Sequence, residues 1–348
     1  MVADKDKMRA FVGKMLDDLG AASVAPLVLL GDRLGLYRAL AGGSFSSAAL
    51  AEKTGLEERY VREWLAAQAT SGYVTYDAEA ETFRLSPEQS AVFADPDSPV
   101  FMAGAFYSLA ALWIDEPKVE KAFRTGQGIG WGEYHPCLFC GTEKFFRPAY
   151  RNHLIEDWIP ALDGMEQKLK AGARVADVGC GHGVSTILLG KSFPESKFYG
   201  FDLHGPSIEH AREMAQEAGV GNVTFELGKA KSFPGEDYDL VAFFDCLHDM
   251  GDPVGASAYV RSRLTGDGRM MVVEPCAGDR LADNFTPVGR LCYAFSTLAC
   301  TPVSKSQEVG LALGAQAGKK RLSEVIREGG FSSVRCVAET AFNIVLEA

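Results

Sequence analysis

The chain has 348 residues, of which 35 are Lys or Arg and 46 are Asp or Glu, so its formal net charge is −11. This acidic balance argues against a main partner with a phosphate backbone. The length allows two domains and a sizeable core. No window reaches the roughly 18 apolar residues that a membrane span needs, and the N-terminus shows no secretory signal. With eight cysteines scattered through apolar segments, we expect a cytoplasmic protein.

The first part of the chain predicts helices followed by a short hairpin. Residues 5–41 carry apolar side chains at helical spacing. Two further helices are expected over 46–55 and 56–72, each ending at a glycine. Residues 73–77 and 82–86 then resemble two strands around a polar turn. Helix, turn, helix and β-wing together predict a winged helix.

Winged helices often bind DNA, so this function needs to be weighed. Acidic residues outnumber basic ones between residues 44 and 86. The helix that would enter the groove begins with Glu57 and Glu58, whose carboxylates would repel phosphates. We therefore do not expect nucleic acid as the partner, and favour a role in dimerisation or in covering a substrate.

From about Leu162 onwards, short apolar runs alternate with helical stretches. This alternation is typical of a parallel α/β sheet with right-handed crossovers. The last two runs are joined by too few residues for a crossover, so we expect an antiparallel hairpin at the edge of the sheet. The expected strands are ARVADVG, KFYGFD, VTFEL, YDLVAFFD, RMMVVEP, FSSVRCVA and AFNIVLEA.

The stretch VADVGCGHG, residues 175–183, follows the first of these strands with glycines on alternate positions. It is not a P-loop, because the only Gly-Lys-Ser tripeptide, at residues 190–192, comes after the next helix. It also departs from the dinucleotide fingerprint G-x-G-x-x-G, because position 184 is Val. A dehydrogenase that uses NAD is therefore disfavoured.

Asp177 adds a chemical argument about the ligand. A carboxylate two residues before the first glycine would oppose a diphosphate, but it suits a ligand with a cationic group. S-adenosylmethionine has an α-ammonium, a sulfonium and no phosphate. Asp202 ends the second strand, where a carboxylate can accept hydrogen bonds from both ribose hydroxyls. The alternative is a glycine-rich turn with two capping aspartates.

The loop and its acids resemble those of class I S-adenosylmethionine-dependent methyltransferases over residues 160–348 or so. The segment before them resembles the dimerisation domain of small-molecule O-methyltransferases. The resemblance implies a Rossmann-like, seven-stranded, mostly parallel sheet with an antiparallel C-terminal hairpin, preceded by a mainly helical winged-helix domain. The expected domains are 1–160, for dimerisation and substrate covering, and 161–348, for catalysis, with a helical insertion at about 275–320.

Carried over position by position, the resemblance implies a set of cofactor-binding residues. Lys229 stands where many family members have an acid that holds the adenine amino group, so the Ala230 backbone or the apolar flank of Leu203 is expected to serve instead. Tyr150 is expected to reach the methionine carboxylate. The full set is Asp177, Gly179, Cys180, Gly181, Asp202, Leu203, Lys229, Ala230, Asp245 and Tyr150.

The segment CLHDM resembles the one that carries the general base of plant-type O-methyltransferases. The resemblance makes His248 the base and Glu274, at the end of the fifth strand, its carboxylate partner. A structural histidine is the alternative. Met250 replaces the family tryptophan, so the acceptor need not be the same kind of phenol.

Two metal or redox motifs are weaker. HPCLFC, residues 135–140, has two cysteines at metal spacing but no second pair of ligands. Catechol-type methyltransferases hold a metal on an Asp after strand four and an Asp-Asn pair after strand five. Asp245 and Asp283-Asn284 echo this, but the pair lies too far beyond Glu274, so no metal is expected.

We expect a small, aromatic or heteroaromatic methyl acceptor, with oxygen favoured over nitrogen or carbon. Residues expected to line its pocket are Trp131, Tyr134, Tyr293 and Ser296. The resemblance also implies a homodimer formed through the N-terminal domain. The alternatives are a winged-helix regulator that binds an adenosyl ligand and a cofactor-binding protein that has lost transfer chemistry.

Overall fold

The computed structural model describes residues 3–348, which form two compact units. The first unit comprises the chain up to Ala110 together with Cys140–Pro148. The second comprises Ala111–Phe139 and Ala149–Ala348.

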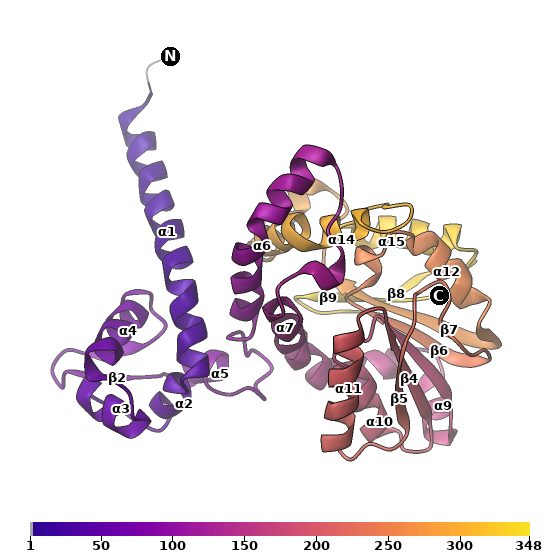
Figure 1. Ribbon diagram of the computed structural model, residues 1–348, viewed down its shortest axis with the longest axis horizontal. Coiled ribbons are helices and arrows are strands. Elements are labelled where there is room, and N and C mark those ends of the chain that lie inside the picture. Colours follow the sequence, from indigo (N-terminus) through magenta and orange to yellow (C-terminus); the bar gives the residue numbers. More distant parts are fainter. Residues whose placement is uncertain (1–2) are drawn as a thin grey trace. The chain divides into compact units, whose positions relative to one another are not determined.

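The first unit is a winged helix preceded by a long helix (Figure 1). Gly35 adopts a φ of 70°, which breaks the expected helical run over 5–41 into α1 and α2. Strands β1 and β2 pair antiparallel as the wing. The elements are α1 (Lys5–Arg33), α2 (Leu36–Leu40), α3 (Ser47–Thr54), α4 (Glu58–Thr70), β1 (Thr75–Asp77), β2 (Thr82–Arg84) and α5 (Pro87–Phe93).

Caps and aromatic packing account for this unit. The Ser46 hydroxyl accepts a hydrogen bond from the Ala49 amide at 3.2 Å, which caps α3 as the sequence predicts. The core centres on Tyr37, whose ring lies 5.1 Å from that of Trp64 and 4.9 Å from that of Phe93. These side chains fix α2, α4 and α5 against one another.

The second unit contains a seven-stranded sheet in the order β5-β4-β3-β6-β7-β9-β8 (Figure 1). The strands from β5 to β7 are parallel, and β9 is antiparallel to both β7 and β8. This confirms the expected mostly parallel sheet with an antiparallel C-terminal hairpin. The strands are β3 (Arg174–Val178), β4 (Lys197–Asp202), β5 (Val223–Leu227), β6 (Tyr238–Phe244), β7 (Leu264–Pro275), β8 (Arg335–Glu339) and β9 (Asn343–Glu347).

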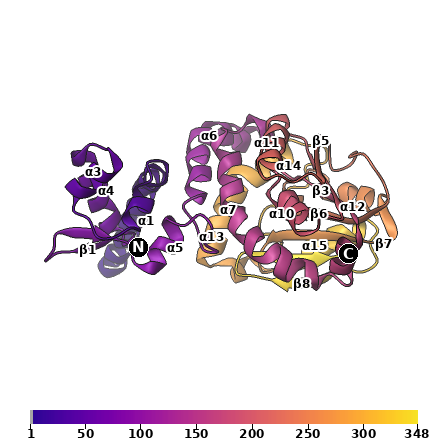
Figure 2. The same cartoon turned by 90° about the horizontal axis from the view of Figure 1, so that it is seen from below.

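Helices accompany the sheet throughout the second unit (Figure 2). Helices α6 and α7 run from one unit into the other. Two short segments are π-helical, η2 and η5. The elements are α6 (Ala105–Thr125), η1 (Trp131–Glu133), α7 (Cys137–His153), η2 (Leu154–Trp158), α8 (Ile159–Ala161), α9 (Met165–Ala171), α10 (Val184–Ser192), α11 (Gly205–Glu217), η3 (Leu247–Asp249), α12 (Pro253–Arg261), η4 (Leu281–Asn284), α13 (Pro287–Phe295), η5 (Ser296–Cys300), α14 (Thr301–Lys305) and α15 (Gly318–Glu328).

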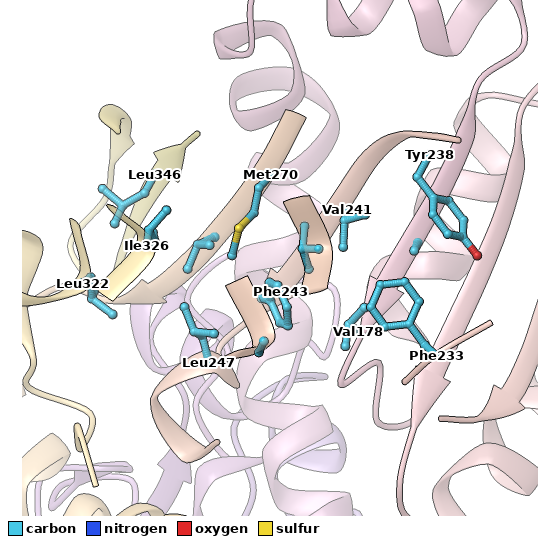
Figure 3. Packing of buried hydrophobic residues seen from close by; sticks show 14 of the residues in the cluster. Val178, Phe233, Tyr238, Val241, Phe243, Leu247, Met270, Leu322, Ile326 and Leu346 are labelled. Atoms are coloured by element: carbon cyan, nitrogen blue, oxygen red, sulfur yellow. The ribbon is translucent and has the colours of Figure 1, made fainter. Parts of the chain in front are cut away.

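Two apolar clusters hold helices to this sheet. One joins strand residues such as Val178 and Met270 to Leu322 and Ile326 of α15 (Figure 3). The other joins α10 and α11 to Phe225 of β5. Burial of both clusters makes the strands a rigid platform, so side chains at their carboxyl ends are held in place.

The division of the chain differs from the expected boundary at residue 160. Residues 111–139 and 149–160 group with the second unit. The reason is a third apolar cluster, in which Ala111, Leu112 and Val119 of α6 pack with Ala299 and Val303. The helices of this cluster thus belong with the insertion at 275–320, which contains η4, α13, η5 and α14.

Among residues 3–348, no helix has both the length and the apolar character that crossing a bilayer requires.

Candidate functional site

The candidate site lies where four parallel strands end side by side. The order β4-β3-β6-β7 places the residues after these strands along one edge of the sheet. From β3 the chain continues to β4 and β5 on one side of the sheet, and it then crosses to β6 and β7 on the other side of β3. Ligands bind at such switch points in open α/β sheets. Each of these strands brings one acidic residue to this edge: Asp202 on β4, Asp177 on β3, Asp245 directly after β6, and Glu274 on β7.

The loop after β3 has a conformation that only glycine adopts readily. Gly179, Gly181 and Gly183 have φ of 80°, 51° and 77°. A Cβ on Gly179 would lie 2.6 Å from Sγ of Cys246, and one on Gly183 would lie 2.6 Å from the Phe225 ring. A Cβ on Gly181 would meet no described atom within 4 Å. The outer two glycines therefore allow close packing, and the middle one leaves open space above the loop.

Asp177 is buried, and one of its oxygens lacks a partner. Oδ2 accepts hydrogen bonds from the hydroxyls of Ser185 at 2.6 Å and Thr186 at 2.7 Å, at the start of α10. Oδ1 is buried and accepts no hydrogen bond from the described residues. Burial raises the pKa of Asp177 to about 6. A cationic ligand would supply the donor and the charge that this carboxylate lacks.

Asp202 joins the second strand to the same loop. Its Oδ2 accepts a hydrogen bond from the Gly181 amide at 2.9 Å, and its Oδ1 accepts one from the His204 amide at 2.8 Å. Burial raises its pKa. Each carboxylate oxygen can accept more than one hydrogen bond, so Asp202 retains capacity for hydroxyl donors beside Gly181.

The residues expected around an adenine follow the ends of β4 and β5. Leu203 follows Asp202 and is 55% exposed, while Lys229 is exposed and Ala230 is half-buried. The Gly228 amide donates to the Asp202 carbonyl at 3.0 Å, which ties this segment to β4. The exposed Leu203 side chain thus offers an apolar face against which a flat adenine ring can pack.

Asp245 is held by two donors at the end of β6. The Tyr150 hydroxyl donates to its Oδ2 and the Asn343 amide to its Oδ1, both at 2.8 Å. Burial, reinforced by Glu274, raises the pKa of Asp245 to about 8. The Tyr150 hydroxyl therefore donates its single proton to Asp245 in this structure.

His248 and Glu274 form a buried pair at the ends of β6 and β7. Nδ1 of His248 contacts Glu274 Oε2, and the His248 amide donates to Oε1 at 3.2 Å. Leu247, fully buried in the sheet core, fixes the short η3 helix that carries the histidine. Burial disfavours the imidazolium, but the carboxylates of Glu274 and Asp249 outweigh it and raise the pKa of His248 well above its usual value.

On its other side, His248 meets two residues that the sequence did not single out. Nε2 lies 3.3 Å from Oδ1 of Asp249, and the thiol of Cys300 contacts both side chains. Gln307 fastens this segment, because its amide donates to the Asp249 carbonyl at 2.8 Å. Cys300 and Gln307 come from the insertion, and a pattern in the sequence gave no sign that they return to the end of β6.

Two separate segments of the chain match known protein families. Residues 169–330 match a family described as a methyltransferase domain, and residues 22–94 match the Rv2258c-like winged HTH domain. The chain contains an S-adenosylmethionine-dependent methyltransferase domain. The expected combination of this domain with an N-terminal winged helix is confirmed.

Curated relatives match less than half of this chain. An uncharacterised methyltransferase, YcgJ of Bacillus subtilis, is 33% identical over 119 residues, which are 33% of this chain and 46% of that protein. A tRNA (guanine-N(7)-)-methyltransferase of Halorhodospira halophila is 26% identical over 152 residues, which are 42% of this chain and 59% of that protein. The chain thus spans about half the length of these relatives.

Solved structures match over the whole length. Human N-acetylserotonin methyltransferase, in complex with S-adenosylmethionine, has a TM-score of 0.70 at 15% identity, covering 100% of this chain and 99% of that one. The mitomycin 7-O-methyltransferase MmcR has a TM-score of 0.65 at 19% identity, covering 98% and 99%. An O-methyltransferase family protein from Burkholderia thailandensis has a TM-score of 0.69 at 16% identity, covering 97% of each chain. At these identities the likeness shows a shared fold.

Three features of the methyltransferase domain suit S-adenosylmethionine as its cofactor. The open space at Gly181, the unpartnered oxygen of Asp177 and the spare acceptor capacity of Asp202 match the three parts of S-adenosylmethionine that need accommodation. These are an amino-acid backbone, an ammonium and a ribose diol.

The residues expected to line an acceptor pocket divide into two kinds. Tyr134 is buried and donates to the Leu298 carbonyl at 2.9 Å, and the Ser296 hydroxyl accepts from the Ala315 amide at 3.1 Å. Both of these groups hold the helical insertion together. Trp131 and Tyr293 are half-buried, and the Trp131 ring lies 5.2 Å from that of Phe139.

The other motifs have ordinary partners. Asp283 pairs with Arg280 at 2.7 Å, and the Asn284 side chain bonds the Gly278 backbone. Asp245 accepts hydrogen bonds from Tyr150 and Asn343. The three residues that echo the metal ligands of catechol-type methyltransferases therefore all contact other protein groups. Cys137 and Cys140 form no disulfide bond with the described residues, and the Cys137 amide donates to Nδ1 of His135 at 3.2 Å.

Proposed function

We propose that this protein transfers a methyl group from S-adenosylmethionine to a hydroxyl oxygen of a small, aromatic or heteroaromatic molecule. The observation that carries the proposal is the buried His248–Glu274 pair beside the loop at Gly181. The full-length likeness to structures titled O-methyltransferases supports oxygen as the acceptor atom.

In this proposal the Asp177 carboxylate receives the ammonium of the cofactor, and Asp202 receives the ribose hydroxyls. The backbone at Gly181 lies against Asp202, because its amide donates to Oδ2 of this residue. Leu203 covers one face of the adenine, and the backbone near Ala230 replaces the family acid. When bound, the cofactor supplies its sulfonium methyl group as the electrophile.

His248 then accepts the proton of the acceptor hydroxyl. If Nδ1–H donates to Glu274, Nε2 of the neutral ring carries the free lone pair that a base requires. Glu274 fixes this tautomer and stabilises the imidazolium that forms. Because His248 has a raised pKa, it is an effective base only when the pH is high enough to deprotonate it.

Positioning contributes beside the base. The strand ends are rigid, and Leu247 and Gln307 hold η3 from two sides. Alignment of acceptor oxygen and methyl group in a site that excludes water can lower the barrier by several kcal/mol, on the order of 7–11 in favourable cases. Trp131 and Tyr293 are proposed to contact the acceptor ring.

The N-terminal unit is proposed to form a homodimer. Six apolar residues on one face of α1 are between 41% and 65% exposed: Met8, Phe11, Val12, Met15, Leu16 and Leu19. A stripe of this size on a long helix marks a protein interface more often than a free surface. A second copy of the chain is the proposed occupant.

DNA binding by the winged helix receives no support from the charges of α4. Arg62 pairs with Glu58 at 2.8 Å and Arg59 contacts Glu63 along the same helix. The exposed basic groups of α4 are thus neutralised within the helix, which leaves little positive potential for a phosphate backbone.

The experiment that tests the function is transfer of labelled methyl from S-adenosylmethionine into a small-molecule extract, followed by identification of the labelled product. We expect label in an aromatic or heteroaromatic hydroxyl compound, with transfer abolished by His248→Ala. Label in nitrogen or carbon positions, or transfer that survives loss of His248, contradicts the proposal.

A further inference from the structure

Three metal-binding atoms from two distant parts of the chain meet at His248 and its neighbours. Nε2 of His248, a carboxylate oxygen of Asp249 and Sγ of Cys300 all lie within 4.8 Å of one another. The first two come from η3, and Cys300 ends the π-helix η5 in the insertion. π-helical turns are frequent at functional sites because they redirect single side chains.

The surroundings of the cluster have the form of a metal site. His248 is 4% and Cys300 8% exposed, so the site is shielded from bulk water. Oδ1 of Asp249 is buried and makes no hydrogen bond of normal geometry with the described residues, although Nε2 of His248 lies 3.3 Å away. A separation of this size between an N and an O ligand suits tetrahedral coordination at about 2.0–2.2 Å from the ion.

Glu274 would orient the histidine ligand of such a site without contacting the ion itself. It contacts Nδ1 of His248, so Nε2 is the nitrogen left for a ligand. Metal-bound histidines almost always donate their other ring nitrogen to a carboxylate or carbonyl in this way. The Gln307 amide holds the Asp249 backbone and keeps both η3 ligands in place.

We propose that His248, Asp249 and Cys300 form a site for Zn²⁺, and that the bound ion inhibits methyl transfer. A thiolate, an imidazole and a carboxylate are the ligand types that zinc prefers, and three of them leave one position for water. The zinc–sulfur bond forms as the thiol releases its proton to solvent. The metal occupies the Nε2 lone pair, so the imidazole can no longer accept a proton. This second half rests on the proposed role of His248 as base.

Binding is tested with Co²⁺ as a spectroscopic substitute for zinc, on the full chain treated with chelator. We expect visible absorption of tetrahedral Co²⁺ and a near-ultraviolet band from thiolate bound to Co²⁺. Cys300→Ser should remove the thiolate band and weaken zinc at least tenfold in competition with a chromophoric chelator. Asp249→Asn should weaken zinc without removing the thiolate band. The matched control is Cys336→Ser, which changes an exposed cysteine on β8.

Inhibition is tested by titrating zinc into the transfer assay, with each variant compared with its own metal-free rate. We expect wild type and Cys336→Ser to lose activity at the same zinc concentration, and Cys300→Ser to require at least ten times more. Absence of the thiolate band in the folded wild type overturns the site whatever the activity shows. A Cys300-dependent band with unchanged transfer keeps the site but overturns the inhibition, and with it the role of His248 as base.

Discussion

The amide and ring of His248 face the two carboxylate oxygens of Glu274, which comes from the end of a different strand. Two contacts between one pair of residues fix both the position and the orientation of the imidazole. The imidazole is therefore held in one orientation, as its proposed role as base requires.

His248→Ala tests this role directly. We expect cofactor affinity to stay within about threefold of wild type, because the residues proposed to bind the cofactor lie at the ends of β3, β4 and β5 and not on η3. General-base catalysis typically contributes on the order of 10²–10⁴-fold, so kcat should fall by that amount. Calorimetry and steady-state kinetics on the same preparation measure both quantities, and unchanged kcat removes the assignment.

The pH dependence of transfer should follow His248. Because the carboxylates raise its pKa above the usual 6.5, the ring is protonated and inactive at low pH, and kcat/KM should rise with pH through a pKa above that value. Glu274→Gln removes a negative charge and should move this limb to lower pH, with a lower maximal rate. A limb that does not move in Glu274→Gln contradicts the electrostatic coupling.

Asp177 links cofactor binding to protons. Its pKa of about 6 reflects burial without a cationic partner, and an ammonium placed against Oδ1 should lower it. Binding of S-adenosylhomocysteine near pH 6 should therefore release protons, which calorimetry in two buffers of different ionisation enthalpy detects.

The corresponding variant is Asp177→Asn, which keeps the acceptor for Ser185 and Thr186. A hydrogen bond to a charged group contributes roughly 1.5–3 kcal/mol, so affinity should fall about 10- to 150-fold and the proton release should disappear. Asp237→Asn, in the turn before β6, is the matched control for lost charge and should bind normally. Equal affinity of the two variants would remove Asp177 from the cofactor site.

The stripe on α1 makes the oligomeric state testable. Phe11→Glu with Leu16→Glu places two charges in the proposed interface and should shift a dimer to monomer in sedimentation velocity, with the fold retained by circular dichroism. Ala10→Glu is the control, because at 100° per residue Ala10 lies on the opposite face of α1. A wild-type monomer, or a double variant that remains dimeric, contradicts the proposal.

The sequence predicted the sheet well, because its strands are short apolar runs with clear ends and its crossovers have one favoured hand. That His248 and Glu274 meet was implied by the resemblance to plant-type O-methyltransferases, and the structure brings the two side chains together. The break at Gly35 was missed, since the apolar spacing continues across it.

The sequence predicted the helical insertion at about 275–320, but its placement on the rest of the unit was beyond prediction from local patterns. Its placement depends on contacts such as Ser296 with Ala315 and Gln307 with Asp249, which join residues far apart in the chain. For the same reason Cys300 was one cysteine among eight in the sequence, and its proximity to His248 emerges only when η5 is folded. The spacing of apolar residues in the sequence likewise does not show that Tyr134 and Ser296 are buried.

The most direct test of the account is calorimetric titration of the wild-type chain with S-adenosylhomocysteine and, in parallel, with NAD. The charge of Asp177 and the open space at Gly181 predict stoichiometric binding of the thioether and no heat from the diphosphate. Uptake of NAD at this loop, with S-adenosylhomocysteine ignored, would contradict the account at its base.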